Sequence, residues 1–469
     1  MEKKLGVRMA EKKIKKIINL VVTFLVFTFF VSLADARPFE NPIASAIKKA
    51  EISSSALISA SFVDVSNGRK IYQMNSNTPM TPASVQKIVT MLPSFNTLGY
   101  DYEFQTQLYK GGNGNLYIKL GADPYLTTKD LKYLIKSLER YKVSSTNAFY
   151  IDDSILDSNE WGDGWQWDDD MNPLIPKFGS YNLDKNIMVI NVNPTQPGAP
   201  ADIFTDVFYP TAFMNNVITG NKTEIQLQRK NYISPDVIDA TGIVSADTQI
   251  EIPVNYPRRY FILRLEDILR KQKISYYGDF NRLKLPTKNI YLICETKHPL
   301  SNAADDILKK SNNMMAETVF KLAGGKYAQE TGSVSAAVEM LNDYYAKQGL
   351  CTDKIKIVDG SGVSKDNLMT ADFVTQVLYK ESKNDSFDNF KKHLATPGVG
   401  TLSDRMLYFK DNLMAKTGTL KNISSIAGYI KTRSGKTYAF CIMTKDSKSK
   451  SADKKAFEEY VLRRAFDEL

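Results

Sequence analysis

Strand-like segments lie near both ends of the chain and are separated by a long region of different character. Near the N-terminal end, "ALISASFVDV" and "KIYQMN" are joined by the turn "SNG", which predicts a hairpin. Near the C-terminal end, "LMAKTGTL", "SIAGYIKT" and "TYAFCIMT" are also strand-like and precede a final helix. Strands from both ends can share one sheet only if the middle of the chain is inserted into it. We therefore predict an α/β fold of the α+β type, in which an antiparallel sheet has helices on both sides and carries a large insert.

The insert is predicted to span residues 96–290, between two parts of the main domain at residues 37–95 and 291–469. Its short segments rich in Tyr, Ile and Val are separated by Gly, Pro and Asn, which predicts a mostly β region made of two small domains. All three tryptophans lie within seven residues in "WGDGWQWDDD". The acids and prolines around them indicate an ordered surface loop.

Residues 1–36 have the layout of a secretory signal, with a basic start, an apolar run and the small-x-small sequence Ala34-Asp35-Ala36. The apolar run is short for a membrane span, although retention as an anchor helix stays open. We expect an exported protein of the periplasm or cell envelope, with membrane association that is at most peripheral. Without residues 1–36, which hold 7 basic and 3 acidic residues, the net charge falls from +9 to +5, which is mild, and no basic stretch is interleaved with aromatics. Nucleic acid is therefore not an expected partner.

The cysteines and histidines predict little chemistry. Cys294, Cys351 and Cys441 are far apart and form no C-x-x-C pair, so they indicate neither a disulfide framework nor a metal site. We expect all three to be buried as small apolar residues, and no metal or cofactor is predicted. The two histidines, His298 and His393, leave few candidates for a serine-histidine relay.

Ser84 and Lys87 stand three residues apart at the predicted start of the helix "TPASVQKIVTML". Positions i and i+3 share a helix face, and first-turn N–H groups favour negative charge at the serine. The Ser-x-x-Lys spacing occurs three more times in the chain, but only this copy follows a Thr-Pro helix start, with Thr81 as the expected N-cap. Lys87 can act as a base only if it is neutral near pH 7, and the alternative is a helix-start serine beside an exposed lysine. Pro93 predicts that this helix kinks or ends early.

Two further segments carry polar groups suited to the same chemistry. "KKSNNMMAE" places Ser311 and Asn313 where a helix begins or is interrupted, although such residues more often act as helix caps. "MAKTGTL" places Lys416, Thr417 and Gly418 in a strand. A cation and a hydroxyl on an edge strand can hold a carboxylate, while glycine lets a ligand backbone come close. The alternative is an ordinary strand with a bulge at the glycine.

The order and context of these three segments resemble the motif set of penicillin-binding proteins and class A β-lactamases. The closer resemblance is to the class C low-molecular-mass penicillin-binding proteins, the D-alanyl-D-alanine carboxypeptidase/endopeptidase family. Three more features match that family. Over 200 residues separate the first two motifs, this insert contains "LGADPYLT", and "VDGSGVS" stands at residues 358–364. "GAD" stands where "GGD" is common, and the tryptophan-rich loop is not a close match. The resemblance implies a transpeptidase/β-lactamase-like main domain.

The implied activity is that of a serine-type D-Ala-D-Ala carboxypeptidase or D,D-endopeptidase acting on peptidoglycan stem peptides, with β-lactam antibiotics as covalent inhibitors. By this resemblance, Ser84 attacks the carbonyl between two D-alanines and Lys87 takes its proton. Ser311 relays that proton to the leaving amine, and Asn313 holds Lys87 and the substrate amide.

The resemblance also assigns substrate contacts. Lys416 and Thr417, followed by Gly418, would bind the terminal carboxylate, and the backbone N–H groups of Ser84 and Thr419 would form the oxyanion hole. The "DGSG" turn would border the site.

Three further substrate-binding candidates are expected outside the catalytic motifs. Ser361 of the "DGSG" turn is one. In the insert, Asp123 and Asp153 are the acids expected to meet the distal amine of the stem peptide, although turn-forming roles explain both equally well.

Two other functions stay open on the sequence alone. A β-lactamase needs the same acylation groups plus a base that activates water for fast deacylation, and the large insert argues against it. A catalytically silent periplasmic binding protein could keep the fold, but the intact motifs argue against decay. The sequence does not distinguish carboxypeptidase from endopeptidase action.

Overall fold

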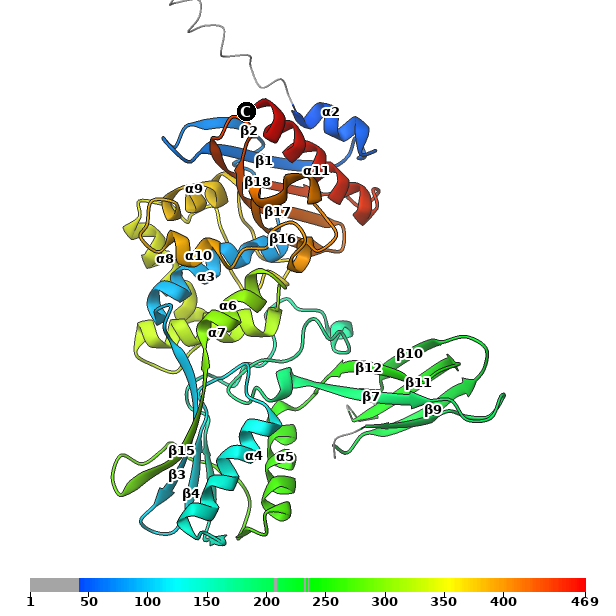
Figure 1. Cartoon of the computed structure of the whole chain (residues 1–469), viewed down its shortest axis with the longest axis vertical. Helices are drawn as coiled ribbons and strands as arrows, with labels where there is room; N and C mark the ends of the chain where they lie inside the picture. Colours follow the sequence, from blue (N-terminus) through cyan, green and yellow to red (C-terminus); the bar gives the residue numbers. More distant parts are fainter. Residues whose placement is uncertain (1–41, 206–208, 232, 235) are drawn as a thin grey trace, which may run out of the picture.

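The computed structural model describes residues 42–205, 209–231, 233–234 and 236–469. The predicted signal at residues 1–36 lies outside the described residues. The described chain forms a tall body with a lobe that projects from its side (Figure 1). No helix within it combines the length and apolar character needed to cross a membrane.

The upper part of the body is built on a five-stranded antiparallel sheet with the order β16-β17-β18-β1-β2. Its strands are β1 (Leu57–Asp64), β2 (Lys70–Met74), β16 (Leu413–Leu420), β17 (Ile423–Lys431) and β18 (Thr437–Lys445). Strands β1 and β18 join the two ends of the chain, with Ala60 opposite Ile442. The predicted sheet shared by both ends is therefore confirmed, and β16 lies at its edge.

Helices cover both faces of this sheet, as predicted (Figure 1). On one side lie α2 (Pro42–Lys49) and α11 (Ser451–Glu468). The other side carries α3 (Gln86–Leu98), α6 (Leu300–Leu308), α7 (Asn313–Ala328), α8 (Val334–Lys347), α9 (Ala371–Glu381) and α10 (Phe387–Lys391). Successive side chains of a strand point to opposite faces, so Cys441 packs among the helices around α3 while Ile442 packs under α11. Burial on both faces explains the continuous apolar character of β18.

Helix α3 continues through Pro93 to Leu98, so the expected early end is wrong. A proline inside a helix has no N–H to donate to the carbonyl four residues earlier. Here that carbonyl belongs to Val89, and the buried hydroxyl of Tyr345 donates to it at 2.7 Å. A contact from α8 thus satisfies the group that the proline leaves free.

The predicted N-cap at Thr81 is also wrong. The chain enters α3 through a 3-10 turn, η1 (Ala83–Val85), and neither segment has a side-chain cap. The Thr81 hydroxyl instead donates to the carbonyl of Lys365 at 3.2 Å. Ala83 has a φ of +49°, a left-handed conformation that few non-glycine residues adopt, and it immediately precedes Ser84.

The lower part of the body is a second five-stranded sheet with the order β14-β6-β4-β3-β15. Its strands are β3 (Glu103–Gly111), β4 (Leu116–Lys119), β6 (Phe149–Asp152), β14 (Asn281–Arg282) and β15 (Ile290–Pro299). It is accompanied by α4 (Thr128–Lys136), α5 (Pro257–Lys271) and the short pair β5 (Ser145–Thr146) and β13 (Ser275–Tyr276). Strand β15 crosses the predicted domain boundary at residues 290/291 because it pairs along β3, with Thr296 opposite Thr106.

The lateral lobe contains two three-stranded sheets, with the orders β12-β7-β8 and β10-β11-β9. Their strands are β7 (Ile187–Asn193), β8 (Asp202–Thr205), β9 (Ala212–Thr219), β10 (Glu224–Arg229), β11 (Val237–Val244) and β12 (Thr248–Pro253). One hydrophobic cluster includes Ile118 of the lower sheet, Leu265 of α5 and Ile190 and Val217 of the lobe. The lower sheet and the lobe therefore share an apolar core.

The three cysteines differ in exposure. Cys441 is buried as expected, Cys294 is half-buried, and Cys351 is exposed, so the expectation is wrong for Cys351. Cys351 follows the end of α8 and lies outside any strand, so it is not buried in the sheet core.

Candidate active site

Ser84 lies half-buried in the 3-10 turn before α3, and Lys87 beside it is fully buried. The Ser84 Oγ and the Lys87 Nζ are 3.0 Å apart. The tight turn therefore brings together the two groups that the i, i+3 spacing indicates, even though the helix itself begins only at Gln86.

The Lys87 amine has two other partners, Asn313 Oδ1 at 2.6 Å and the Ser361 carbonyl at 2.7 Å. Burial lowers the pKa of Lys87 to about 7, against the raising effect of Asp359 and Glu317. A neutral amine has two N–H donors and one lone pair. With both donors directed to Asn313 and Ser361, the lone pair is left to accept the proton of the Ser84 hydroxyl.

Two buried acids position the carbonyl that holds Lys87. Glu317 lies one turn after Asn313 on α7, and its carboxylate accepts from the backbone N–H groups of Gly360 and Ser361, each at 2.8 Å. Burial, with a smaller contribution from the Asp359 charge, raises the pKa of Glu317 above its usual value. Sequence reasoning missed Glu317, although its i+4 spacing from Asn313 places it on the same helix face.

Asp359 closes the "DGSG" turn on itself. Its carboxylate accepts from the backbone N–H groups of Gly362 and Ser364 at 2.8 and 2.7 Å, and from the side chain of Asn367 at 2.9 Å. The turn borders the site, as expected. The side chain of Ser361 is fully buried, so this residue presents its carbonyl to Lys87 rather than its hydroxyl to a substrate.

Strand β16 approaches the backbone of Ser84 at Gly418. A Cβ added there would lie 2.8 Å from the Ser84 nitrogen and 3.0 Å from the Ala83 Cβ, so a side chain cannot fit without displacement. The hydroxyl of Ser425 on β17 fixes the same segment by donating to the Pro82 carbonyl at 2.6 Å. The edge strand, with exposed Thr419 just beyond Gly418, is thereby held against the start of α3.

The Lys416 side chain is also fully buried, and its Nζ donates to the Thr417 carbonyl at 2.8 Å. Burial, with a smaller contribution from the Lys87 charge, holds the pKa of Lys416 well below its usual value. The Thr417 hydroxyl donates to that of Thr401 at 2.8 Å, a neighbour that sequence reasoning missed. An incoming carboxylate would provide the counter-charge that Lys416 lacks.

The capping role predicted as the alternative for "SNN" belongs to Asn312, whose side chain accepts from the Met315 N–H at 2.9 Å. Ser311 and Asn313 on either side of it are left for the site. Ser311 has a φ of +65° between α6 and α7, and its side chain is partly accessible. Asn313 uses both ends of its amide, because its Nδ2 donates to the Leu174 carbonyl at 2.8 Å.

Leu174 belongs to the tryptophan loop, defined here as residues 158–178. The loop is anchored by Trp165, which is buried and donates from Nε1 to Asp359 at 2.9 Å. Trp167 is 85% exposed. The predicted surface loop therefore exists, but one tryptophan fastens it to the same turn that holds Lys87.

A hollow of about 620 Å³ lies between the tryptophan loop and the end of β16. Thr419 and Leu420 form one wall, and Asp169 of the loop and Lys365 lie among the other lining residues. This cleft begins at Thr419, one residue beyond the Gly418 that lies against the Ser84 backbone, so a substrate paired with the end of β16 would extend into it. Sequence reasoning did not identify Asp169, because nothing in "WDDD" distinguishes one acid from the next.

The two acids predicted to bind the distal amine are engaged elsewhere. The Asp123 carboxylate is buried and lies 2.6 Å from His298 Nδ1, while Asp153 forms an ion pair with Arg282 at 2.7 Å. Within the described chain, no hydrogen bond or ion pair joins either acid to the Ser84 cluster.

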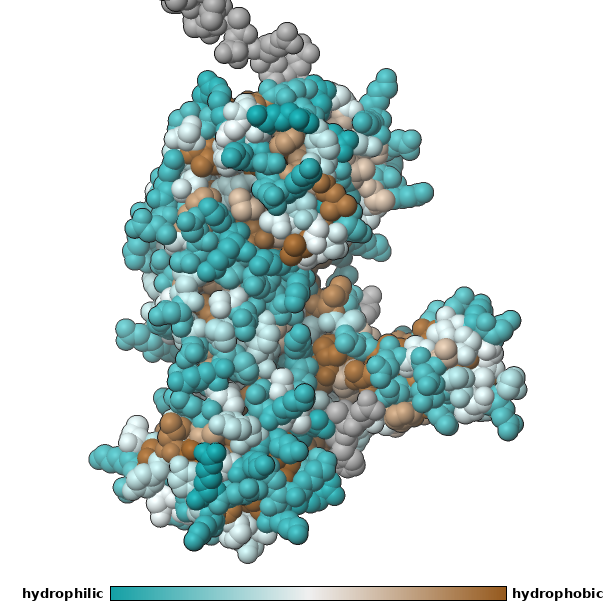
Figure 2. Space-filling model, in the orientation of Figure 1, coloured by the Kyte–Doolittle hydropathy of each residue, from teal (hydrophilic) through white to brown (hydrophobic). Residues whose placement is uncertain are grey.

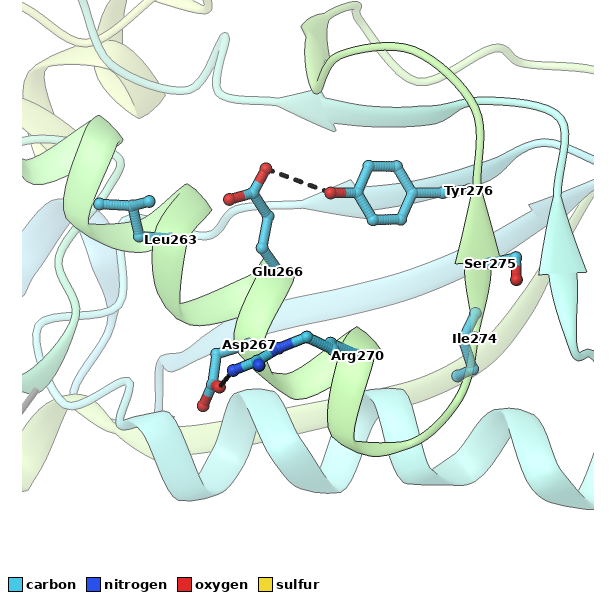
Figure 3. Close-up of a pocket in the computed structure, with 7 residues that line it drawn as sticks. All are labelled: Leu263, Glu266, Asp267, Arg270, Ile274, Ser275 and Tyr276. Carbon is cyan, nitrogen blue, oxygen red and sulfur yellow. Dashed lines mark hydrogen bonds and ion pairs between the residues drawn. The ribbon is translucent and has the colours of Figure 1, made fainter. Parts of the chain in front are cut away.

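Another hollow, of about 690 Å³, lies beside α5 in the lower body (Figure 3). Its polar groups pair with one another: Arg270 lies 2.7 Å from Asp267, and the Tyr276 hydroxyl donates to Glu266 at 3.2 Å. Because these side chains already bond to one another, the hollow lacks the features of a reaction site.

A serine hydroxyl against a buried amine, at the start of a helix beside an edge strand, defines the serine acyl-transfer enzymes that include the penicillin-binding proteins. The sequence model of the D-Ala-D-Ala carboxypeptidase 3 (S13) family matches residues 40–465, so the chain belongs to this family. It is a D-Ala-D-Ala carboxypeptidase of the low-molecular-mass class C type, and the resemblance seen in the sequence is confirmed.

Relatives and solved structures agree with this assignment. The chain is 24% identical over 396 residues to D-alanyl-D-alanine carboxypeptidase DacB of Haemophilus influenzae, covering 80% of this chain and 83% of that protein. It is 25% identical over 406 residues to the D-alanyl-D-alanine carboxypeptidase of an Actinomadura species, covering 78% and 74%. Penicillin binding protein 4 (dacB) from Haemophilus influenzae has a similar structure, with a TM-score of 0.79 at 22% identity over 91% of this chain and 99% of that one. The predicted fold class is thus confirmed.

Proposed function

We propose that the protein hydrolyses the D-Ala-D-Ala bond of peptidoglycan stem peptides, as a carboxypeptidase or endopeptidase, through an acyl-enzyme on Ser84. The observation that carries the proposal is the buried Lys87 amine, with a pKa of about 7, at 3.0 Å from the Ser84 hydroxyl. The amine is basic enough to take the hydroxyl proton and is largely neutral at physiological pH.

In the acylation step, the Ser84 Oγ attacks the carbonyl carbon between the two D-alanines while its proton passes to Lys87. The backbone N–H groups of Ser84 and Thr419 stabilise the oxyanion. When the C–N bond breaks, the Ser311 hydroxyl relays the proton from Lys87 to the leaving amine. Terminal D-alanine departs and an ester on Ser84 remains.

In the deacylation step, a water molecule attacks the ester and Lys87 takes its proton. The bond to Oγ then breaks and the proton returns to Ser84, so that the enzyme is regenerated. Asn313 holds Lys87 in line throughout. The Asn313 Nδ2 also donates to the oxygen of a substrate amide, which would replace the Leu174 carbonyl as its acceptor.

The terminal carboxylate binds Lys416 and Thr417 next to Gly418. Because the pKa of Lys416 is depressed by burial in the absence of a counter-charge, an arriving carboxylate restores the charged ammonium and gains an ion pair in a desolvated site. The requirement for a free carboxylate at this position favours substrates that end in D-Ala-D-Ala.

Among the acids of the insert, we assign the distal amine of the stem peptide to Asp169 rather than to Asp123 or Asp153. Asp169 lines the cleft together with Thr419, whereas the other two are paired with His298 and Arg282. The carboxylate in the cleft supplies the charge that an ammonium requires.

β-Lactams present a reactive amide to the same serine and would leave a stable ester on Ser84. A second solved structure of Haemophilus influenzae penicillin binding protein 4, with a TM-score of 0.75 at 21% identity, is complexed with a β-lactam, which supports this extension. The predicted signal at residues 1–36 supports export to the periplasm or cell envelope, where peptidoglycan is found.

The test is labelling by a fluorescent penicillin, combined with intact-mass measurement and assay of D-alanine release from a pentapeptide. We expect one adduct on the peptide containing Ser84 and no labelling of Ser84→Ala. Ser447→Ala is a matched control, because exposed Ser447 stands in another Ser-x-x-Lys sequence. An adduct on another serine, or none, would overturn the mechanism.

A further inference from the structure

A separate hollow of about 440 Å³ is lined by other residues of the tryptophan loop than the cleft beside Thr419. Its walls come from the tryptophan loop, from Asn231 in the turn after β10, and from Asn255 and Tyr256 at the start of α5. Figure 1 shows α5 beginning where the lateral lobe joins the body, and Figure 2 shows apolar side chains gathered at this junction. The volume lies in the range of about 300–1,000 Å³ found for small-molecule sites.

Aromatic faces form part of the wall. Trp167 is 85% exposed and Tyr256 is 40% exposed, although both stand on ordered segments. Trp161 is packed edge to face against Trp165, with ring centroids 5.0 Å apart, and is thereby fixed in the wall. A large indole left in water offers an apolar face to a flat ligand.

The uncharged polar part of the wall is made mostly of side-chain amides. Asn159, Asn231 and Asn255 line the hollow, and each amide carries both donors and an acceptor. The Asn231 Nδ2 donates to Asp170 at 3.0 Å, which fixes the amide. Groups of this kind suit ligands whose polar atoms both donate and accept.

The charges around the hollow balance one another. Asp170 lies 3.7 Å from the Arg229 Nε, and Glu160 and Lys177, which both line the hollow, attract each other. The Lys177 Nζ lies 5.4 Å from the centre of the Tyr256 ring, so the protein's own cation takes the cation–π position. The hollow therefore offers no surplus charge to an anionic or cationic ligand.

We propose that this hollow binds a sugar ring of a glycan, with one face of the ring stacked on Trp167 and its hydroxyl and acetamido groups bonded to the surrounding asparagines. A pyranose ring has apolar faces and a rim of neutral groups that both donate and accept, which matches the wall. Stem peptides are attached to a strand of such rings. The site thus goes beyond hydrolysis at Ser84 and would hold the glycan of the polymer that carries the substrate.

The two sites are linked through one short turn. Trp167 faces the glycan hollow and Asp169 lines the catalytic cleft, and both belong to η3 (Trp167–Asp169). The same loop bonds Asp359 through Trp165 and Asn313 through the Leu174 carbonyl. A sugar bound at Trp167 would therefore also steady the loop that contacts the catalytic groups.

The test is calorimetric titration of the full chain with chitotetraose, a neutral oligomer of N-acetylglucosamine. We expect saturable binding by the wild type and by Ser84→Ala, and binding roughly tenfold weaker for Trp167→Ala, the loss expected of one stacking contact. The matched control is Tyr277→Ala, which removes another exposed aromatic outside the hollow and should leave binding unchanged.

Penicillin labelling of Trp167→Ala verifies that the variant is folded. Absence of saturable binding by the wild type, or equal binding by Trp167→Ala and the wild type, would overturn the proposal. Since Ser84→Ala is expected to bind the sugar without being acylated, failure of the glycan site and failure of the proposed hydrolysis give different results.

Discussion

The acylation rate should fall steeply below pH 7, because only neutral Lys87 can take the proton of Ser84. Burial lowers the pKa of this lysine from 10.5 to about 7 against the opposing effect of the Asp359 and Glu317 charges, a net shift that corresponds to about 5 kcal/mol in favour of the neutral amine. The direction of the pH effect follows from the role of Lys87 as the base. Protonation below pH 7 removes the lone pair that faces Ser84, while deprotonation above pH 7 restores it.

The size of the effect follows from the same pKa. Two units below it, at pH 5, about 1% of Lys87 is neutral, so the second-order rate of acylation should be roughly 100-fold below its plateau. Lysine with its ordinary pKa would place the midpoint above pH 10. The assay is stopped-flow measurement of fluorescent penicillin binding from pH 5 to pH 9 at constant ionic strength, with near-ultraviolet circular dichroism to verify folding.

Lys87→Arg is the companion variant. Arginine keeps the positive charge but does not lose a proton, so acylation should fall by about two to four orders of magnitude across the whole pH range. A flat wild-type profile between pH 5 and pH 9, a midpoint near pH 10, or near-normal acylation by Lys87→Arg would each refute the role given to Lys87.

Three further predictions concern other parts of the fold. Gly418→Ala should reduce acylation by at least roughly tenfold with little change in secondary structure, because its Cβ would meet the Ser84 nitrogen, and fluorescent penicillin labelling measures this. Asp169→Asn should raise KM for stem peptides with a free distal amine while leaving penicillin acylation unchanged, and equal loss for both ligands would contradict the assignment. Tyr345→Phe should lower the free energy of unfolding by about 1–3 kcal/mol in urea titrations, since the Val89 carbonyl beside Pro93 loses its donor.

The acids of the insert show where sequence reasoning fails. Asp123 and Asp153 each follow a strand-like run, where loops and sites are common, and this made them candidates. Their actual partners are His298, 175 residues away from Asp123, and Arg282. A carboxylate is available to a substrate only if it is not already paired with a cation of the protein. Such a cation can come from a distant part of the chain, and no local sequence pattern shows which distant segments lie close together in the fold.

The helix at Ser84 also shows that a tertiary contact can override a local sequence signal. Thr-Pro is a sound signal for a helix start, yet the turn at Ala83 places that start at Gln86 without a side-chain cap. Pro93 is a sound signal for an early end, yet the Tyr345 hydroxyl lets the helix continue. In both places a contact from a distant residue decides the outcome that local propensity leaves open.

The sequence by itself determined the sheet shared by the two chain ends, the strand that carries "KTG" and the contact between Ser84 and Lys87. Each of these depends on strand pattern or on a spacing of three residues, which act over short distances along the chain. The tertiary structure decided the state of Lys87. Its pKa near 7 requires burial together with Asn313 and the Ser361 carbonyl, groups more than 200 residues away in the chain. Desolvation and hydrogen bonding depend on what surrounds an atom in space, and only the folded chain brings those surroundings together.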